Sequence, residues 1–165
     1  EMCIRDRSVA IRMMTQIKER YPNALLLLAG NGPKQRFLEE LIAELGLQNN
    51  VKLLGYVTNL QDYQHIIDIQ VCCSKREGLP LNVVESMLSG NAIVATYNRG
   101  HRELIRNGEN GYLVPQNAPN AMADKVLTLL EDENLKSKME TAAHVFATKY
   151  GFSSITKELA KIYGL

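Results

Sequence analysis

Short apolar runs recur along the chain and predict buried strands. The clearest is Ala24-Leu25-Leu26-Leu27-Leu28-Ala29, which is apolar throughout and is followed at once by Gly30-Asn31-Gly32-Pro33. A strand that is covered on both faces of a parallel sheet has this pattern, because neither face meets water. Together with similar runs, it predicts five strands, at residues 24–29, 51–54, 68–74, 92–96 and 111–114.

Between and after these runs, apolar positions recur at helical spacing. The first helix is predicted over residues 9–21, because Pro22 disfavours a helix at the residue before it. Further helices are predicted over residues 37–45, 59–66, 83–88, 103–106, 121–130, 135–150 and 153–163. Strands that alternate with helices predict an α/β fold, here a Rossmann-like doubly wound parallel sheet with a helical tail. Ligands of such a sheet bind beyond the carboxyl ends of its strands.

The composition excludes several classes of protein. A chain of 165 residues that is 45% hydrophobic and 22% charged suits one globular domain. Its 19 basic and 18 acidic residues are mixed along the sequence, and no block of lysine or arginine marks a nucleic-acid-binding surface, so we do not expect nucleic acid as a partner. The longest apolar run is far shorter than the ~20 residues of a membrane span. Cys3, Cys72 and Cys73 suit neither a disulfide framework nor a zinc site, so a reducing cytoplasm is the expected compartment.

The amino end differs in character from the rest of the chain. Residues 1–7 have no apolar period, and the segment Met2-Cys3-Ile4-Arg5-Asp6-Arg7 looks like a translated sequencing adapter. We therefore expect residues 1–7 to be a non-native leader, residues 8–165 to be the domain, and the chain to be a fragment. The alternative is an ordinary polar lead-in to the first helix.

Two glutamates mark the most informative segment. Glu77 follows the strand predicted at 68–74, and Glu85 lies in the first turns of the next predicted helix. Gly78 allows a close approach of the backbone, and Pro80 stiffens the turn, so that the following N–H groups face a ligand. A helix start of this kind suits a diphosphate. Glu85 then suits a ribose diol and Glu77 a transferring sugar; the alternative is that both glutamates are solvated surface charges.

The sequence around these glutamates carries a family resemblance. Residues 74–96, 99–105 and 107–114 closely resemble the carboxyl-terminal domain of family 4 glycosyltransferases, whose two Rossmann-like domains form the GT-B arrangement. The resemblance extends over roughly residues 9–165. It implies that Glu77 contacts the donor sugar as the catalytic residue and that Glu85 binds the ribose of the nucleotide.

The resemblance also implies the remaining donor contacts. The loop that touches the sugar and phosphates corresponds to Gly78, Leu79, Pro80, Leu81, Asn82 and Val83. Tyr56 and Val57 correspond to the segment that lines the nucleobase pocket, although simple packing is an equal alternative for Tyr56. Gly30, Asn31 and Gly32 correspond to the turn beside the donor cleft. The chain has no Asp-x-Asp motif, so we expect neither a metal site nor a cofactor beyond the nucleotide-sugar substrate.

The chain departs from the family pattern in two ways. Such enzymes usually carry, before the first helix of this domain, a strand that ends in Gly-Arg, and a lysine a few residues later, whose cations neutralise the diphosphate. That stretch is absent, and Arg5 and Arg7 lie in the suspected leader, so we assign neither to this role. The amino-terminal domain, which recognises the acceptor, is also absent. We therefore expect this chain to be inactive alone.

The resemblance implies a retaining transfer of a hexose or N-acetylhexosamine from a nucleotide-diphosphate sugar. The acceptor would be a glycan or a lipid-linked precursor in polysaccharide biosynthesis, such as capsule assembly, with the full-length enzyme at the inner face of the membrane. Two alternatives are a sugar-nucleotide epimerase on the same frame and a non-catalytic nucleotide-binding module.

The other polar residues carry weaker signals. Arg99, His101 and Arg102 follow the strand predicted at 92–96, where solvation is expected more than contact with an anion. His65 and His144 are expected to have structural roles, because no second ligand lies at metal spacing.

Overall fold

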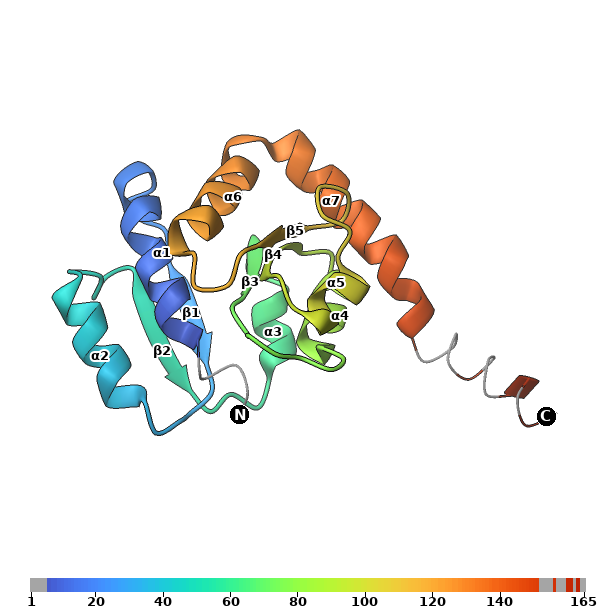
Figure 1. Ribbon diagram of the computed structural model, residues 1–165, viewed down its shortest axis with the longest axis horizontal. Coiled ribbons are helices and arrows are strands. Elements are labelled where there is room, and N and C mark those ends of the chain that lie inside the picture. The colour runs from blue at the N-terminus through green and yellow to red at the C-terminus, as the bar shows by residue number, and fades with distance from the viewer. Residues whose placement is uncertain (1–5, 152–155, 157–159, 162, 164–165) are drawn as a thin grey trace.

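All five predicted strands are present, and every pair of neighbouring strands is parallel. The structure, a computed structural model, describes residues 6–151, 156, 160, 161 and 163. Its strands are β1 (Leu26–Ala29), β2 (Val51–Gly55), β3 (Ile69–Cys72), β4 (Ala92–Thr96) and β5 (Tyr112–Val114). Helices alternate with all five strands, so the α/β prediction is confirmed (Figure 1).

The helices follow the predicted order, and the last of them, after β5, follow one another without a strand between them. They are α1 (Arg7–Arg20), α2 (Gln35–Glu44), α3 (Leu60–Gln64), α4 (Leu81–Leu88), α5 (Arg99–Leu104), α6 (Pro119–Glu131) and α7 (Glu133–Ala147), with a 3-10 turn at Thr148–Tyr150. The helix predicted over 153–163 lies mostly outside the described residues. None of the helices in the described part of the chain is long and apolar enough to cross a membrane.

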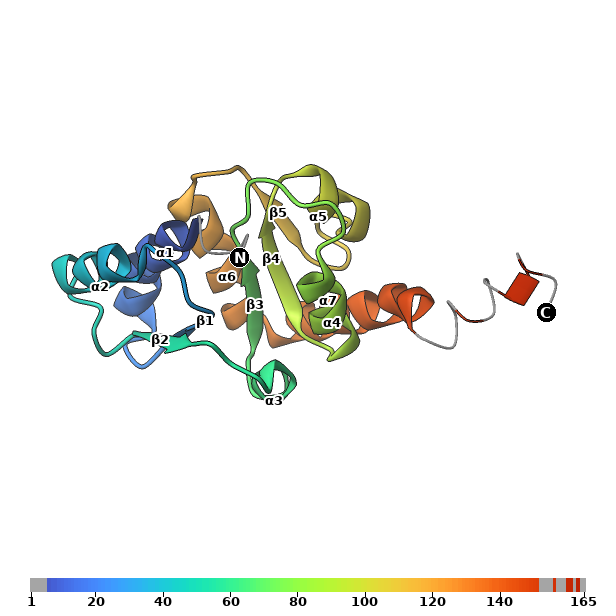
Figure 2. The same ribbon diagram turned by 90° about the horizontal axis from the view of Figure 1, so that it is seen from below.

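The strands form two hydrogen-bonded groups. β1 pairs with β2, and β3 pairs with β4, which pairs with β5. Within the residues that the structure describes, no strand pairs with both β1 and β3. This break falls where the common doubly wound strand order places one more strand between the two halves. Figure 2 shows the two groups lying beside each other, with α3 following β2.

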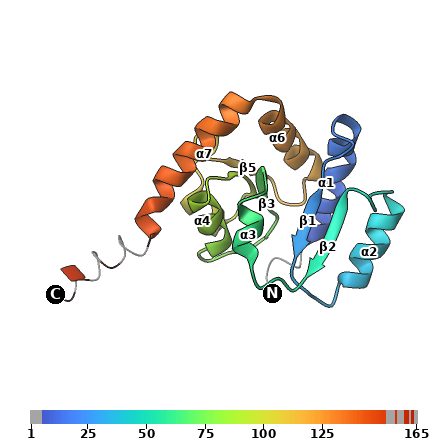
Figure 3. The ribbon, with the colours of Figure 1, turned by 180° about the vertical axis from the view of Figure 1, so that it is seen from behind.

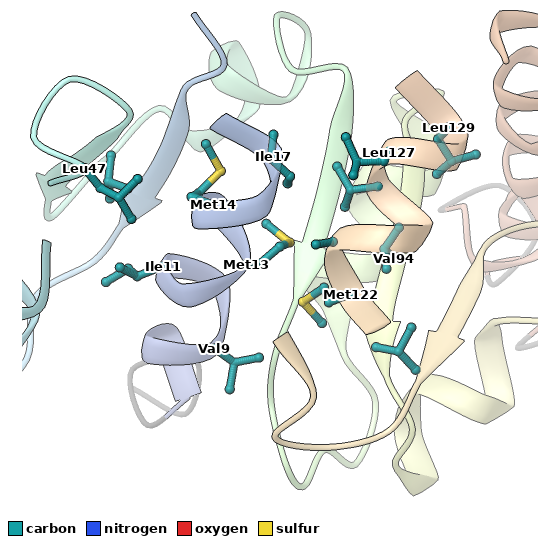
Figure 4. Packing of buried hydrophobic residues seen from close by; sticks show 14 of the residues in the cluster. Val9, Ile11, Met13, Met14, Ile17, Leu47, Val94, Met122, Leu127 and Leu129 are labelled. Atoms are coloured by element: carbon teal, nitrogen blue, oxygen red, sulfur yellow. The ribbon is translucent and has the colours of Figure 1, made fainter. Parts of the chain in front are cut away.

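One hydrophobic core unites the two groups of strands. Leu28 of β1 and Val71 of β3 both pack against the same buried cluster, which is built largely from α1 and α6. Figure 4 shows Met13 and Ile17 on the side of α1 that faces α6, the helix that carries Met122. Burial of each large aliphatic side chain contributes about 1.5–3 kcal/mol, so this cluster holds the two halves in one unit.

A second core fixes the helix that follows Glu77. Val83 and Met87 of α4 are fully buried, at 0% exposure, in a cluster with Leu104 and Ala143. α7 packs beside α4 and then leads away from the sheet toward the carboxyl terminus (Figure 3). Because one side of α4 is anchored in this way, Glu85 on its other side is exposed to solvent.

The prediction for α5 was wrong in its position. A short helix was predicted over residues 103–106, whereas α5 spans Arg99–Leu104. The cause is a side-chain cap, because Asn98 accepts a hydrogen bond from the N–H of His101 at 2.9 Å. Such a cap satisfies one of the orphan donors of the first turn and starts the helix four residues before its predicted position.

Candidate functional site

The loops after β1 and β2 meet at the carboxyl ends of these strands. The Gly30 N–H donates to the Gly55 carbonyl at 2.5 Å. Both glycines have a positive φ, +101° for Gly30 and +68° for Gly55, a backbone conformation that residues with a Cβ rarely adopt. The Asn31 carboxamide oxygen lies 3.1 Å from the place where a Gly55 Cβ would stand. The predicted turn and the predicted base-binding segment are therefore neighbours.

The side chain of Tyr56 extends from this edge into solvent. It is 77% exposed, so the packing alternative is wrong. Val57 beside it is half-buried. A small pocket near this edge is lined by Arg7, Gly30, Gly32, Gln35, Leu38, Leu53 and Gly55.

The Glu77 loop, residues 75–80, connects β3 to α4. The start of the loop is held by a residue that follows β5. The Gln116 amide donates to the Lys75 carbonyl at 2.9 Å and to the carbonyl of Tyr97, which follows β4, at 3.0 Å. Glu77 itself is half-buried, and Gly78 and Leu79 are exposed. The loop therefore has a fixed base, a half-buried Glu77 and an outer part that is exposed at Gly78 and Leu79.

The loop leads into the first turn of α4. Pro80 is the N-cap, and the N–H groups at the start of a helix carry a partial positive charge. The Val83 N–H already donates to the Pro80 carbonyl at 3.0 Å, and the Val83 side chain is fully buried. Leu81 is 61% exposed. Of the three predicted backbone donors, Leu81 and Asn82 are therefore better placed than Val83 to meet a ligand.

The amino end of α1 joins the two edges. The Asp6 carboxylate accepts a hydrogen bond from the Lys75 N–H at 3.1 Å and pairs with the Lys75 ammonium at 3.3 Å. The next residue, Arg7, donates to the Gly30 carbonyl at 2.8 Å and also to the Ala29 carbonyl. Whether residues 1–7 are a foreign leader stays a prediction, but Asp6 and Arg7 make these contacts as integral parts of the fold.

The expectation that His101 is solvated was wrong. Its side chain is buried, at 1% exposure, whereas Arg99 and Arg102 beside it are exposed. Burial lowers the pKa of His101 from its usual 6.5, and the hydrogen bond to the Thr96 carbonyl and the charge of Glu77 offset only part of this effect. The imidazole is therefore neutral at pH 7.

The other histidines lie away from this edge. His65 is exposed, and His144 contacts the Leu88 carbonyl at 2.9 Å. Among the described residues, no group of three histidine, cysteine or acidic side chains is placed to hold a metal ion.

Comparison with known protein families shows to which family this chain belongs. The family model described as Glycosyl transferases group 1 matches residues 7–145, which include every predicted site residue. The chain belongs to the group 1 glycosyltransferases. The predicted glycosyltransferase resemblance is thereby confirmed at the level of this family.

The similar proteins and solved structures agree with this assignment. The chain is 31% identical over 159 residues to the putative glycosyltransferase EpsD of Bacillus subtilis, covering 96% of this chain but 42% of EpsD. The structure of Anabaena HepE in complex with UDP matches with a TM-score of 0.87 and 25% identity, covering 94% of this chain and 44% of HepE. The chain thus spans less than half the length of these proteins.

One structural match concerns a single domain. The carboxyl-terminal domain of the group 1 glycosyltransferase LpcC from Francisella tularensis matches with a TM-score of 0.81 and 27% identity, covering 88% of this chain and 80% of that domain. This likeness agrees with the Rossmann-like fold described above.

Sequence reasoning missed several residues that hold the loops of this candidate site in place. Asn98 had a local signal, because asparagine before a short helical stretch is a typical N-cap. Asp6 and Gln116 had none, since their partner Lys75 lies 69 and 41 residues away along the chain. Such contacts depend on strand order, which brings distant loops to the same edge.

Proposed function

We propose that this chain is the donor-binding domain of a retaining family 4 glycosyltransferase of the GT-B type. The observation that carries the proposal is the segment from Glu77 to the first turn of α4, at the carboxyl ends of the parallel strands, in which Gly78, Leu79 and Leu81 are exposed. Open parallel sheets bind ligands in this place. The match to the carboxyl-terminal domain of LpcC supports the position of this domain within a longer enzyme.

The donor proposed for this site is a nucleotide-diphosphate sugar. HepE, whose fold this chain shares, has been solved in complex with UDP and with UDP-glucose. The partial positive charge at the start of α4 suits a diphosphate, which the Leu81 and Asn82 N–H groups would hold. Glu85, about one helical turn further on, would accept hydrogen bonds from the ribose hydroxyls, and the exposed ring of Tyr56 would lie against the base.

Glu77 has a separate role in the proposed mechanism. Its carboxylate would accept hydrogen bonds from sugar hydroxyls and stabilise the positive charge that develops at the anomeric carbon as the bond to the diphosphate breaks. The helix start would stabilise the leaving diphosphate at the same moment. Donor binding and leaving-group stabilisation then come from one continuous segment of ten or so residues.

The acceptor side of the reaction is assigned to another domain. A protein as long as EpsD has room for a second domain, to which we assign recognition of a glycan or lipid-linked acceptor. We propose that a hexose or N-acetylhexosamine is transferred in bacterial polysaccharide assembly, such as that of capsule, in the cytoplasm at the inner face of the membrane. This domain alone would bind donor without transferring the sugar.

Calorimetric titration of the chain with UDP, GDP, dTDP and ADP tests the proposal. We expect at least one of these nucleotides to bind, and Glu85→Ala to weaken it about tenfold or more, since hydrogen bonds to a charged group contribute about 1.5–3 kcal/mol. Glu109→Gln, an exposed glutamate in the turn before β5, is the control and should leave the affinity unchanged. Absence of binding by all four nucleotides would exclude a donor-binding role.

A further inference from the structure

A buried polar cluster lies beneath the Glu77 loop and plays no part in the proposed donor contacts. It consists of Thr96, Asn98 and His101, which are 1%, 6% and 1% exposed. These residues end β4 and begin α5, and each polar side chain among them is hydrogen-bonded. Buried polar groups with complete partners specify one local arrangement, because every alternative leaves a donor or acceptor unsatisfied.

Two of these side chains converge on a single carbonyl at the base of the loop. The Thr96 hydroxyl donates to the Ser74 carbonyl at 2.6 Å, and the Asn98 amide donates to the same oxygen at 2.8 Å. The side-chain oxygen of Asn98 accepts a hydrogen bond from the backbone N–H of His101 at 2.9 Å. Asn98 therefore ties the start of α5 to the residue from which the Glu77 loop departs.

His101 completes this cluster through its ring. Its Nδ1 lies 2.6 Å from the Thr96 carbonyl, and because a carbonyl only accepts, Nδ1 carries the proton. The Asn98 amide nitrogen, 3.0 Å from Nδ1, then has its own acceptor at Ser74. The ring thus closes the turn from Thr96 to His101 and holds the first turn of α5 in place.

Gly100 lies in this first turn of α5 and packs directly against the Glu77 loop. A Cβ at Gly100 would stand 2.6 Å from the Gly78 carbonyl and 2.9 Å from both the carbonyl oxygen and the Cβ of Glu77. The φ of Gly100 is not in the left-handed region, so its need for glycine is steric. The backbone of α5 is therefore in direct contact with the residue proposed to meet the donor sugar.

We propose that Asn98, Gly100 and His101 are positioning residues, which set the place of the Glu77 carboxylate relative to the donor sugar. This inference rests on the proposed function. The nucleotide contacts depend on α4, which Val83 and Met87 anchor from its opposite side. Loss of the cluster should therefore move Glu77 while leaving the nucleotide contacts in place.

The experiment compares the affinities of UDP and UDP-glucose by calorimetry for matched variants. The reference is Glu77→Gln, which defines how far the ratio of the two dissociation constants changes when the sugar contact is impaired. We expect His101→Leu to change this ratio in the same direction, by about fivefold, with UDP affinity within about twofold of wild type. His101→Asn, which keeps a side-chain N–H, should restore most of the ratio.

Two further variants separate positioning from a general loss of structure. His144→Leu is the matched control, since His144 also bonds a backbone carbonyl, that of Leu88 at the far end of α4, and it should leave the ratio unchanged. Gly100→Ala keeps every hydrogen bond of the cluster and should change the ratio as His101→Leu does, which gives an answer even where His101→Leu fails to fold.

The outcomes distinguish failure of the positioning role from failure of the proposed function. An unchanged ratio in folded Gly100→Ala or folded His101→Leu, or equal losses for UDP and UDP-glucose in either variant, would overturn the positioning role while the donor site stands. If wild type bound none of UDP, GDP, dTDP and ADP, or if Glu77→Gln left the ratio unchanged, the proposed function would fail first and this inference with it. If a nucleotide other than UDP binds, that nucleotide and its glucose conjugate replace UDP and UDP-glucose in the comparison.

Discussion

The carboxylate of Asp6 accepts a hydrogen bond from the backbone N–H of Lys75, which lies 69 residues later in the chain. Asp6 is 5% exposed, and the residue after it holds the Gly30 carbonyl. One dipeptide at the start of α1 thus ties the loop after β1 to the loop after β3. Since no described strand joins β1 to β3 directly, this tie aligns the two halves of the proposed donor site.

Asp6→Ala should destabilise the fold by about 1–3 kcal/mol, because the Lys75 N–H loses its partner at a partly buried contact. Asp6→Asn keeps an acceptor oxygen and should recover most of this loss. The free energy of unfolding from urea titration measures both.

Lys75→Ala separates the hydrogen bond from the ion pair. It keeps the backbone N–H and removes only the ammonium, whose side chain is 50% exposed, so it should cost at most about 1 kcal/mol. Equal losses for Lys75→Ala and Asp6→Ala would show that the ion pair, and not the hydrogen bond, dominates this contact.

Gly100→Ala should destabilise the chain by about 1–3 kcal/mol, as is typical when a methyl group is forced into a filled space. The added Cβ meets the backbone of Glu77 and Gly78, which yields only if the loop moves. Gly78→Ala is the stability control, because a Cβ there meets nothing within 4 Å. Thermal unfolding of the two variants gives the comparison, and a Gly100→Ala variant as stable as Gly78→Ala would contradict the close packing.

The stability of the fold should fall as the pH drops below about 6.5, in part because of His101. Its pKa is lowered in the folded state by burial, so the unfolded chain binds the proton more readily. The contribution of His101 is therefore complete above the unfolded pKa and is lost as the pH falls from there through the folded pKa. Urea unfolding at pH 7.5 and 5.5 measures this.

His101→Asn isolates the histidine from the other titrating groups. It removes the titration, so the drop between the two pH values should be smaller in this variant than in wild type. The same drop in both proteins would mean that His101 is not the group responsible.

Met13→Ala should cost about 2–5 kcal/mol, because Met13 is 2% exposed in the core shared by both groups of strands. Met13→Leu nearly conserves the volume and should cost less than about 1.5 kcal/mol. Urea titration compares the two, and a loss below about 1 kcal/mol for Met13→Ala would argue against a single core built on α1.

The strands were predictable because their signal is local. A run such as residues 92–96 is fully buried at every position, and a strand covered on both faces is apolar throughout. The Glu77 loop was predictable for a related reason, since its place after β3 and before α4 follows from the order of the elements. The alternation of strands and helices therefore sufficed for the fold class and for the edge on which the Glu77 loop lies.

The burial of His101 was not predictable, because it depends on partners outside its own segment. The sequence places it between Arg99 and Arg102, which are both exposed. Its environment is set by Asn98, which reaches the Ser74 carbonyl 24 residues back along the chain. That distance is spanned only once β3 and β4 pair, so the pattern around His101 alone gave the wrong exposure.

The place of α5 shows how a single side chain shifts an element boundary. The apolar positions near residues 103–106 predicted a helix there, but the cap at Asn98 begins it at Arg99. This shift bears on the proposed role of Glu77, because Gly100 in the first turn of α5 lies against that residue.

The most direct test of the central claim follows the amide resonances of the chain by NMR as UDP is added. If the start of α4 holds the diphosphate, the largest shifts should fall on Leu81 and Asn82, with Glu85 also affected. Resonances of α7 away from the site, such as Ser137, should not move. Substituting UDP-glucose for UDP should then add a change at Glu77. Saturation with UDP that left Leu81 and Asn82 unmoved while other residues shifted would contradict the account.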